Sequence, residues 1–454
     1  MPNLLDAVYS LTIGPHYLWH RYVTDRYGPH CDEKTGRIPD RFRSAATRVV
    51  GRDGEDPHYE PPCLWLHAVS VGEAIASRNL ARMFMADNPL WELKVSTTTR
   101  TGRKVAADAH GEDGVFYYPL DFSWMVRRAF DLVRPDMVTL MELEIWPNFL
   151  AEAERRDIPV VVANARITGR SAKRLARVPR VAGTMVRAVR KWFPQTPLYA
   201  ERLRAIGVPE ERMEILGSVK YDAVPEEVDP AVEAEWRALF GCHLAPERPL
   251  AVAGSTHPGE EKAVLDALRE AAGKGAPRAR VALAPRHPER LPEVAGLARA
   301  YGETELRSLL GKDPSSLPDV IVCDVMGDLS KIYAAADVVF VGGGLARRGG
   351  QNFIEPCGIG KPTVVGPNLW NFAEAAEALS EVDGIRIVPG AADLVEAFRD
   401  LLSDGKKARA MGMRARKLLL SKGGASRRIA DRLDELAREV MRKRRKPRWG
   451  DSSG

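Results

Sequence analysis

The sequence of 454 residues is poor in cysteine and lacks the short motifs that hold metals. Its five cysteines are scattered and odd in number, and none belongs to a C-x-x-C pair, which argues against a disulfide framework and a structural zinc site. No D-x-D triplet is present, so the sequence offers no acidic motif of the kind that chelates a divalent cation. We therefore expect no metal and no cofactor.

Long apolar runs are also missing, and none reaches the length that a membrane-spanning helix requires. The N-terminus lacks a secretory signal, because Asp6 and Pro15 interrupt its short apolar stretch and no basic segment precedes it. Residues 4–19 carry leucines and aromatic side chains, so they predict either a short interfacial helix or a helix docked on its own domain. We expect the protein to stay in the cytoplasm.

Acidic residues are absent from 158–200, a segment that holds nine cations, and a second basic cluster lies at 442–448. Surfaces of one sign suit polyanions such as anionic lipid, lipid phosphates or nucleic acid, although a solvated helix face is the alternative. Against nucleic acid, the sequence has no aromatic-rich RNA motif and no helix-turn-helix signature. The nine cations are Arg166, Arg170, Lys173, Arg174, Arg177, Arg180, Arg187, Arg190 and Lys191.

Short apolar runs alternate with helical patterns along the chain, which predicts an α/β architecture with mostly parallel sheets. The length favours two domains, and segment 222–230 is rich in proline and acid with no apolar period. We therefore expect domains at 1–222 and 223–454, with ligands bound in a cleft at the carboxyl ends of the strands. The expected strands are 64–69, 93–97, 114–117, 137–141 and 160–163, then 250–253, 281–284, 320–323, 338–341, 363–365 and 385–387.

A first candidate carboxylate follows the predicted strand 64–69. Ser70 and Glu73 form an S-x-x-E pattern at the start of an apolar helix, which is a capping box that satisfies backbone amides. The functional alternative makes Glu73 a general base, kept ionised by the positive end of the helix dipole. The local sequence is compatible with both interpretations.

A second acidic site follows the predicted strand 137–141. Glu142 and Glu144 would share a face if the chain is extended, so that one could raise the pKa of the other. An ion-pair site for nearby arginines is the structural alternative. Because the charges come directly after an apolar strand, we favour a functional role.

Two further segments point to phosphate chemistry. Gly342, Gly343 and Gly344 lie between a predicted strand and a predicted helix, where backbone N–H groups can meet a phosphate, although the glycines could mark only a tight turn. The carboxylate of Glu355 could hold ribose hydroxyls. Arg286, after the predicted strand 281–284, offers a guanidinium fork to a phosphate or lies in a surface turn.

Taken in order, these segments resemble one family, the 3-deoxy-D-manno-octulosonic acid (Kdo) transferases of lipid A and lipopolysaccharide biosynthesis. The resemblance runs along almost the whole chain, and its strength lies in the number and order of the motifs. These motifs are LHAVSVGEA, STTTRTG, YYPLDF, MELEIWPN, NARITGRSAKR, LGSVKYD, GSTHPGEE, APRHPER, DVMGDLSKIYAAADVVFVGGGL, RRGGQNFIEP and GPNLWNFAEAAEAL.

The resemblance implies a GT-B fold, in which two Rossmann-like domains face each other across a cleft. It implies an inverting, metal-independent glycosyltransferase that moves Kdo from CMP-Kdo to a lipid A precursor of the lipid IVA type. The C-terminal half would bind the donor and the N-terminal half the acceptor. The partners are then these substrates and an anionic membrane surface, without nucleic acid, at the cytoplasmic face of the inner membrane, where the protein is peripheral or weakly anchored.

The resemblance also assigns roles to individual positions. Glu73 matches the family's general base, and Glu142 and Lys220 match residues that support the transition state. The segments that contact CMP correspond to Pro285 and Arg286, to Met326, Gly327 and Asp328, and to Asn352, Phe353, Ile354 and Glu355.

Three positions depart from the family's pattern, which has glutamate at 328, serine at 344 and histidine at 351. Asp328 has a shorter side chain, and Gln351 replaces a titratable ring, so we assign no acid role to Gln351. Two rival interpretations stay open: another GT-B enzyme, such as a sugar-nucleotide epimerase or a transferase with a different donor, and a nucleic-acid-binding protein.

Overall fold

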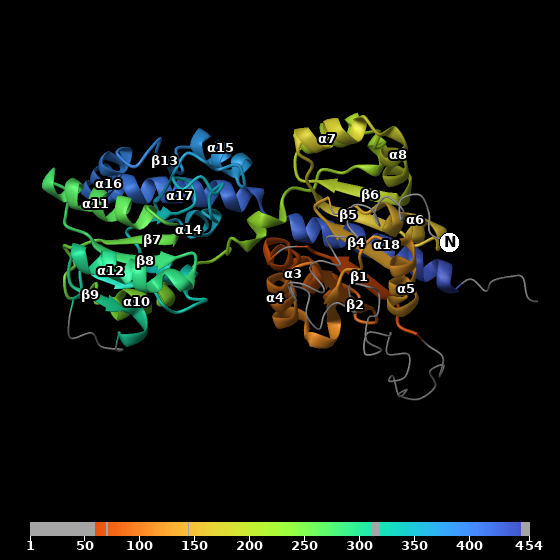
Figure 1. The fold of residues 1–454 in the computed structure, drawn as a ribbon, viewed down its shortest axis with the longest axis horizontal. Coiled ribbons are helices and arrows are strands. Elements are labelled where there is room, and N and C mark those ends of the chain that lie inside the picture. Colours follow the sequence, from red (N-terminus) through yellow and green to blue (C-terminus); the bar gives the residue numbers. More distant parts are fainter. Residues whose placement is uncertain (1–59, 70, 144, 311–316, 446–454) are drawn as a thin grey trace, which may run out of the picture. The chain divides into compact units, whose positions relative to one another are not determined.

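The computed structural model describes residues 60–69, 71–143, 145–310 and 317–445, which form two compact α/β units (Figure 1). Of the described residues, those in 60–222 and 424–445 belong to unit 1, and those in 223–423 belong to unit 2. The chain thus passes from unit 1 to unit 2 and then returns. The C-terminal helix lies within 223–454, the range expected for the second domain, but it belongs to unit 1.

Unit 1 is built on a six-stranded sheet with the strand order β3-β2-β1-β4-β5-β6. Every neighbouring pair is parallel, and the order is that of a Rossmann fold. Four of the six strands, β1, β3, β4 and β5, are buried along their whole length, as expected for parallel strands covered by helices. The strands are β1 (Cys63–His67), β2 (Glu92–Thr97), β3 (Val115–Tyr117), β4 (Met137–Met141), β5 (Val160–Ala165) and β6 (Val189–Pro194).

Helices cover both faces of this sheet. One face packs against α5, α6, α7, α8 and α9, and the other packs against α3, α4 and α18. Trp65 lies at the centre of the first face, where Phe116, Phe130 and Phe149 surround its ring at centroid distances of 5.0–5.3 Å. The helices are α3 (Val71–Asp87), α4 (Arg100–His110), α5 (Ser123–Val133), α6 (Pro147–Arg155), α7 (Gly169–Ala176), α8 (Pro179–Ala188), α9 (Pro197–Ala205) and α18 (Ala425–Arg445).

The apolar stripe of α18 explains why this helix joins unit 1. Ile429 and Leu433 are fully buried in the same core cluster as Leu80 and Phe84 of α3. Asp222, the last residue of the unit's first segment, accepts a hydrogen bond from the Ala425 N–H at 3.1 Å and so caps the start of the helix. The spacing of its apolar residues indicates a helix with one buried face but does not indicate which unit buries that face.

Unit 2 is built on a seven-stranded sheet with the order β13-β12-β11-β7-β8-β10-β9, again parallel throughout. One face packs against α11, α12, α16 and α17, and α13 contacts β7. The strands are β7 (Leu250–Thr256), β8 (Arg280–Pro285), β9 (Thr304–Leu306), β10 (Val320–Val322), β11 (Val338–Val341), β12 (Thr363–Val365) and β13 (Arg386–Ile387). The helices are α10 (Pro230–Leu239), α11 (Glu260–Gly273), α12 (Leu291–Tyr301), α13 (Leu329–Ala335), α14 (Ile354–Gly358), α15 (Ala373–Glu381), α16 (Asp393–Ser403) and α17 (Gly405–Lys422).

Each sheet has a switch point, which is the position where the strand order reverses. In unit 1 the reversal lies between β1 and β4, and in unit 2 it lies between β7 and β11. In open parallel sheets, ligands bind outside the carboxyl ends of the strands at such a switch point. The loops that follow β1, β4, β7 and β11 are therefore the first candidates for ligand binding.

Within the described ranges, no helix is both long enough and apolar enough to cross a membrane. The predicted interfacial helix at 4–19 and residues 446–448 of the basic C-terminal cluster lie outside the described residues. The part of that cluster that α18 includes is anchored on unit 1. Lys443 pairs with Asp157 at 3.0 Å, and Arg444 pairs with Asp136 at 2.8 Å.

His67 is a fully buried imidazole at the end of β1. Its ring stacks on Tyr118 at 3.9 Å, and its Nδ1 lies 3.0 Å from the carbonyl oxygen of Ser96. No described residue hydrogen-bonds its Nε2. Burial lowers the pKa of His67 from its ordinary 6.5 to about 3, against the opposing effect of the Ser96 hydrogen bond, so the folded protein holds this ring neutral.

This burial predicts a pH-dependent stability of unit 1. Below about pH 6.5 the unfolded chain binds a proton on His67 that the folded chain excludes, so the free energy of unfolding should fall by about 1.4 kcal/mol per pH unit. Urea unfolding followed by tryptophan fluorescence from about pH 6.5 to about pH 5 measures the slope. His67→Gln should remove that part of the slope, and an unchanged slope in the variant would contradict the assignment.

Candidate functional site

Glu73 lies in the first turn of α3, directly after the carboxyl end of β1. One carboxylate oxygen, Oε2, accepts a hydrogen bond from the backbone N–H of Val69 at 3.0 Å, and the side chain is half-buried. The hydrogen bond to the backbone at the helix start agrees with the capping interpretation. The position of the carboxylate at the switch point agrees with its interpretation as a general base. Ser70, the other half of the predicted capping box, lies outside the described residues.

Glu142 follows β4, on the opposite side of the same switch point. Its backbone is left-handed (φ 57°), an uncommon conformation for a residue with a side chain, and its N–H donates to the carbonyl oxygen of Ala163 on β5. The Lys220 Nζ lies 3.7 Å from Glu142 Oε1, and both side chains are partly buried. The structure therefore brings together two of the three predicted catalytic side chains. Glu144 lies outside the described residues, so the proposed coupling of the two carboxylates stays a prediction.

Asn164, which we did not single out from the sequence, helps to hold Lys220 in this position. Its Oδ1 accepts a hydrogen bond at 3.2 Å from the N–H of Val219, the first residue of the short helix η5 (Val219–Ala223). Its own carbonyl accepts from Gln195 Nε2 at 2.9 Å, and its backbone is left-handed (φ 54°). A buried amide in an otherwise apolar strand is the signal that could have found it.

In unit 2, Pro285 is the last residue of β8, and Arg286 is the first residue after it. The N–H of Arg286 donates to the carbonyl oxygen of Thr256 at 2.9 Å, which fixes its backbone beside the end of β7, while its side chain is exposed. His257, the next residue after β7, is buried and lies edge-to-face with His287 at 5.5 Å.

Several charged groups act on the imidazole of His257. Burial lowers its pKa below the ordinary value, and Glu260 opposes this shift, whereas His287, Arg348 and Arg286 add to it. The loops after β7, β8 and β11 therefore meet around His257. They form a cationic edge that can bind an anion.

Segment 326–328 forms an exposed turn before α13. Met326 is 72% exposed, Gly327 has a left-handed backbone (φ 97°), and Asp328 stands at the N-cap of α13 without a side-chain capping bond. The carboxylate of Asp328 instead lies 3.7 Å from Lys331 Nζ and 3.9 Å from Arg307. The shortened acidic side chain is thus held between cations of its own unit.

The last predicted segment divides into exposed and buried residues. Asn352 is exposed, whereas Phe353 and Ile354 are buried, and Phe353 packs against Phe372 at 5.3 Å. The side chains of Phe353 and Ile354 are therefore part of the core, and only their backbone can contact a ligand. Burial raises the pKa of Glu355 above its ordinary value, and a hydrogen bond with Ser330 opposes this rise.

The backbone N–H groups of the glycine-rich loop after β11 bind a carboxylate of the protein itself. The carboxylate of Glu260 accepts hydrogen bonds from the N–H groups of Gly343, Leu345 and Ala346 at 2.8–3.1 Å. From the sequence we expected these N–H groups to bind a phosphate. That expectation is wrong for the N–H groups of Gly343, Leu345 and Ala346, which donate to Glu260. We did not single out Glu260 from the sequence.

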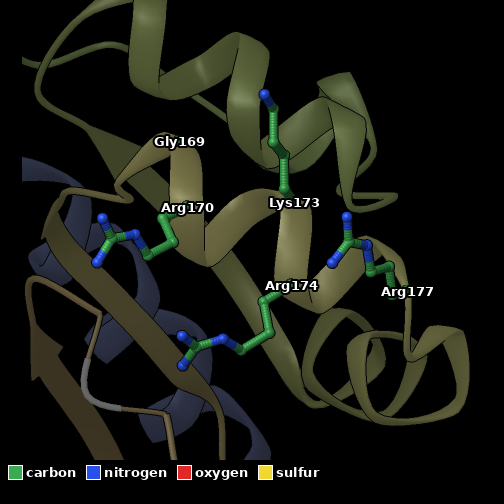
Figure 2. A pocket seen from close by; sticks show the side chains of 5 residues that line it. All are labelled: Gly169, Arg170, Lys173, Arg174 and Arg177. Atoms are coloured by element: carbon green, nitrogen blue, oxygen red, sulfur yellow. The ribbon is translucent and has the colours of Figure 1, made fainter.

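The cationic stretch 158–200 does not form one surface. Arg190 lies on β6 and pairs with Glu439 of α18, and Lys191 donates to the carbonyl oxygen of Glu211 at 2.9 Å. In contrast, a hollow on unit 1 is lined by residues of α7 and its C-cap that form no ion pair with any described residue. Figure 2 shows these side chains spreading from the helix. They are Arg170, Lys173, Arg174 and Arg177, with Gly169 at the helix start.

The described residues contain no cluster of three or more His, Cys, Asp and Glu side chains that could hold a metal ion. They instead provide Glu73, Glu142 and Lys220 on unit 1 and the cationic edge around His257 on unit 2. A carboxylate can remove a proton from a hydroxyl group, and guanidinium groups can bind a phosphate that carries a leaving group. These are the parts that a nucleotide-dependent group transfer needs.

Sequence comparisons place this chain among known proteins. Residues 33–223 match the family model described as 3-deoxy-D-manno-octulosonic-acid transferase (kdotransferase). The 3-deoxy-D-manno-octulosonic acid transferase of Haemophilus influenzae is 33% identical over 87% of this chain and 91% of its own. The transferase of the same name from Bordetella pertussis is 31% identical over 87% of this chain and 91% of its own.

Solved structures show the same architecture. UDP-GlcNAc 2-epimerase from Neisseria meningitidis, bound to UDP-GlcNAc, matches 82% of this chain and 100% of its own with a TM-score of 0.53 and 15% identity. At this identity the likeness concerns the fold alone, which is the predicted GT-B class with two parallel α/β units.

Proposed function

The chain belongs to the Kdo transferase family, and we propose that it transfers Kdo from CMP-Kdo to a lipid A precursor of the lipid IVA type, with inversion at the anomeric carbon. The observation that carries this proposal is the position of Glu73 at the switch point of unit 1, at the end of β1, with the Glu142–Lys220 pair after the neighbouring strand β4. This arrangement offers a carboxylate base after one strand and a second carboxylate, paired with a lysine, after the neighbouring strand.

In the proposed reaction, Glu73 accepts the proton of an acceptor hydroxyl, whose oxygen forms a bond to the anomeric carbon of Kdo. The bond from that carbon to the CMP phosphate oxygen breaks, and CMP leaves with the electron pair. The start of α3 supports the ionised form of Glu73, because a helix N-terminus and a backbone N–H both stabilise negative charge. The ammonium group of Lys220 can stabilise charge that develops during the transfer.

On the donor side, Arg286 is the main candidate for binding the phosphate of CMP. Its guanidinium is exposed, while its backbone is fixed by the hydrogen bond to Thr256. A planar guanidinium can donate two parallel hydrogen bonds to a phosphate. The exposed turn at Gly327 and the exposed Asn352 supply further polar groups in unit 2 for the nucleotide. No step of this reaction calls on a metal or a cofactor.

Substitution of Glu73 by glutamine tests the proposed base. The amide keeps an oxygen that can accept from Val69 N–H, so the helix start should stay intact, but it cannot accept the acceptor's proton. We expect kcat to fall about 10²- to 10⁴-fold, with little change in thermal unfolding. The assay measures Kdo transfer from CMP-Kdo, generated in situ from Kdo and CTP by a Kdo-activating synthetase, to a tetra-acylated disaccharide.

Glu396→Gln is the matched control, because it makes the same change in the first turn of α16. Glu396 pairs with Lys274 at the C-terminal end of α11, the end opposite to the switch point of unit 2. Glu396→Gln should leave kcat unchanged. A folded Glu73→Gln protein with the turnover of the wild type would show that this carboxylate only caps the helix.

We further propose that the cationic hollow on α7 contacts the anionic membrane surface from which a lipid acceptor is drawn. Arg170 and Arg174, like Lys173 and Arg177, are spaced four residues apart, so each pair shares a side of the helix end (Figure 2). These four cations form no ion pair with a described residue, so within that part of the chain they lose no ion pair when they bind lipid headgroups. Each basic residue near such a surface contributes about 1 kcal/mol.

The double substitution Lys173→Gln and Arg174→Gln should weaken binding to vesicles that contain anionic lipid by at least about tenfold, as measured by co-sedimentation at low salt. The matched control is Arg190→Gln with Lys191→Gln, since these cations of the same stretch already have protein partners. Equal losses in the two doubles would show that only net charge matters, and no loss in the α7 double would remove this helix from the membrane contact.

A further inference from the structure

Glu260 is a fully buried carboxylate, 2% exposed, at the switch point of unit 2. It is the first residue of α11, which follows β7, and its partners lie in the loop that follows β11. In addition to the three amides of that loop, Glu260 Oε2 accepts from the N–H of His257 at 2.9 Å. One side chain therefore connects the two loops between which a Rossmann-type sheet usually binds its ligand.

The glycine-rich loop is shaped to enclose this carboxylate. A Cβ built on Gly342 would lie 2.6 Å from Glu260 Oε2 and 2.5 Å from the carbonyl oxygen of Ser255, so no side chain fits there. Gly343 has φ 83°, a left-handed conformation that favours glycine, and its N–H lies 2.8–2.9 Å from both carboxylate oxygens. Successive amides that converge on one point form an anion nest of the kind that binds phosphates in other proteins.

Further hydrogen bonds extend from this nest to the cationic edge. The Arg348 N–H donates to the carbonyl oxygen of Gly343 at 2.8 Å, and the Gln351 N–H donates to that of Gly342 at 3.0 Å. The Gln351 side-chain nitrogen lies 3.1 Å from Nε2 of His257, whose backbone N–H binds Glu260. These bonds form a closed ring from Glu260 through the loop and back to Glu260, so the position of the loop depends on the carboxylate.

We propose that Glu260 is a positioning residue for the donor: it fills the amide nest with an internal anion and holds Arg348 on the same cationic edge as Arg286. The phosphate of the nucleotide is then excluded from the nest and is bound by guanidinium groups instead. This inference rests on the proposed CMP-sugar donor, and it concerns how unit 2 presents its cations, not which residue removes the acceptor's proton.

The neighbouring Glu261 offers a matched control. It is also fully buried on α11, but it binds Arg290 through two hydrogen bonds of 2.6 and 3.1 Å and accepts from Thr256 Oγ1 at 2.8 Å. None of its hydrogen bonds reaches the glycine-rich loop. Replacement of Glu261 by glutamine thus perturbs a buried carboxylate of the same helix without opening the nest.

The test measures CMP binding to the full-length wild type, Glu260→Gln and Glu261→Gln by isothermal titration calorimetry, with thermal unfolding as a check on folding. Glutamine turns one acceptor oxygen into a donor that opposes the nest's N–H groups, so the Kd for CMP should rise at least about tenfold. Glu261→Gln should keep an affinity near that of the wild type. In the transfer assay, Glu260→Gln should raise the KM for CMP-Kdo and leave the KM for the acceptor unchanged, a split that a general loss of folded protein does not produce.

A second variant tests the internal anion directly. Glu260→Ala leaves an open nest of four N–H donors, and added formate should fill it and restore CMP affinity without affecting the wild type. The inference would be overturned if either folded Glu260 variant bound CMP as tightly as the wild type without formate. The proposed function would then stay intact. Affinity that stays weak in formate would also overturn the inference. A wild type that does not bind CMP would overturn the proposed donor, and the inference with it.

Discussion

The parallel direction of every strand is the constraint on which the rest of this structure depends. Because all strands of a sheet point the same way, the loops at their carboxyl ends gather at one edge. Glu73 and Glu142 are 69 positions apart in the sequence, yet they follow the neighbouring strands β1 and β4. The same rule brings His257, Arg286 and the glycine-rich loop together in unit 2. The sites are thus consequences of topology, and each needs only a few side chains to complete it.

Buried polar side chains then fix the loops that topology has gathered. In unit 1, the Asn164 amide binds the start of η5 and so supports the position of Lys220. In unit 2, the Glu260 carboxylate binds four backbone amides from two loops. Such groups cost free energy to bury unless each polar atom has a partner, so a fully bonded amide or carboxylate favours one loop conformation over others. The residues that would act on substrate can then stay partly exposed.

Much of the fold could be predicted from the sequence, because apolar runs in parallel strands are long and regular. Strand β6 escaped prediction because Arg190 and Lys191 interrupt its apolar pattern, and β9 escaped because it has only three residues at a sheet edge. The periodicity of α18 could not indicate which unit buries it. For the site, motifs identified the segments but not the direction of side chains, so the burial of Phe353 and the capture of the loop amides by Glu260 became visible only in the structure.

In the proposed reaction, the carboxyl edge of the unit 2 sheet holds the nucleotide of the donor. Amide hydrogen exchange of the full-length protein, with and without CMP, tests it most directly because it reports on all loops at once. CMP should slow exchange in peptides covering 286–290, 326–331 and 347–355, and it should leave exchange at 142–148 and 164–168 unchanged. Slower exchange confined to the loops of unit 1, or no slowing anywhere at saturating CMP, would contradict it.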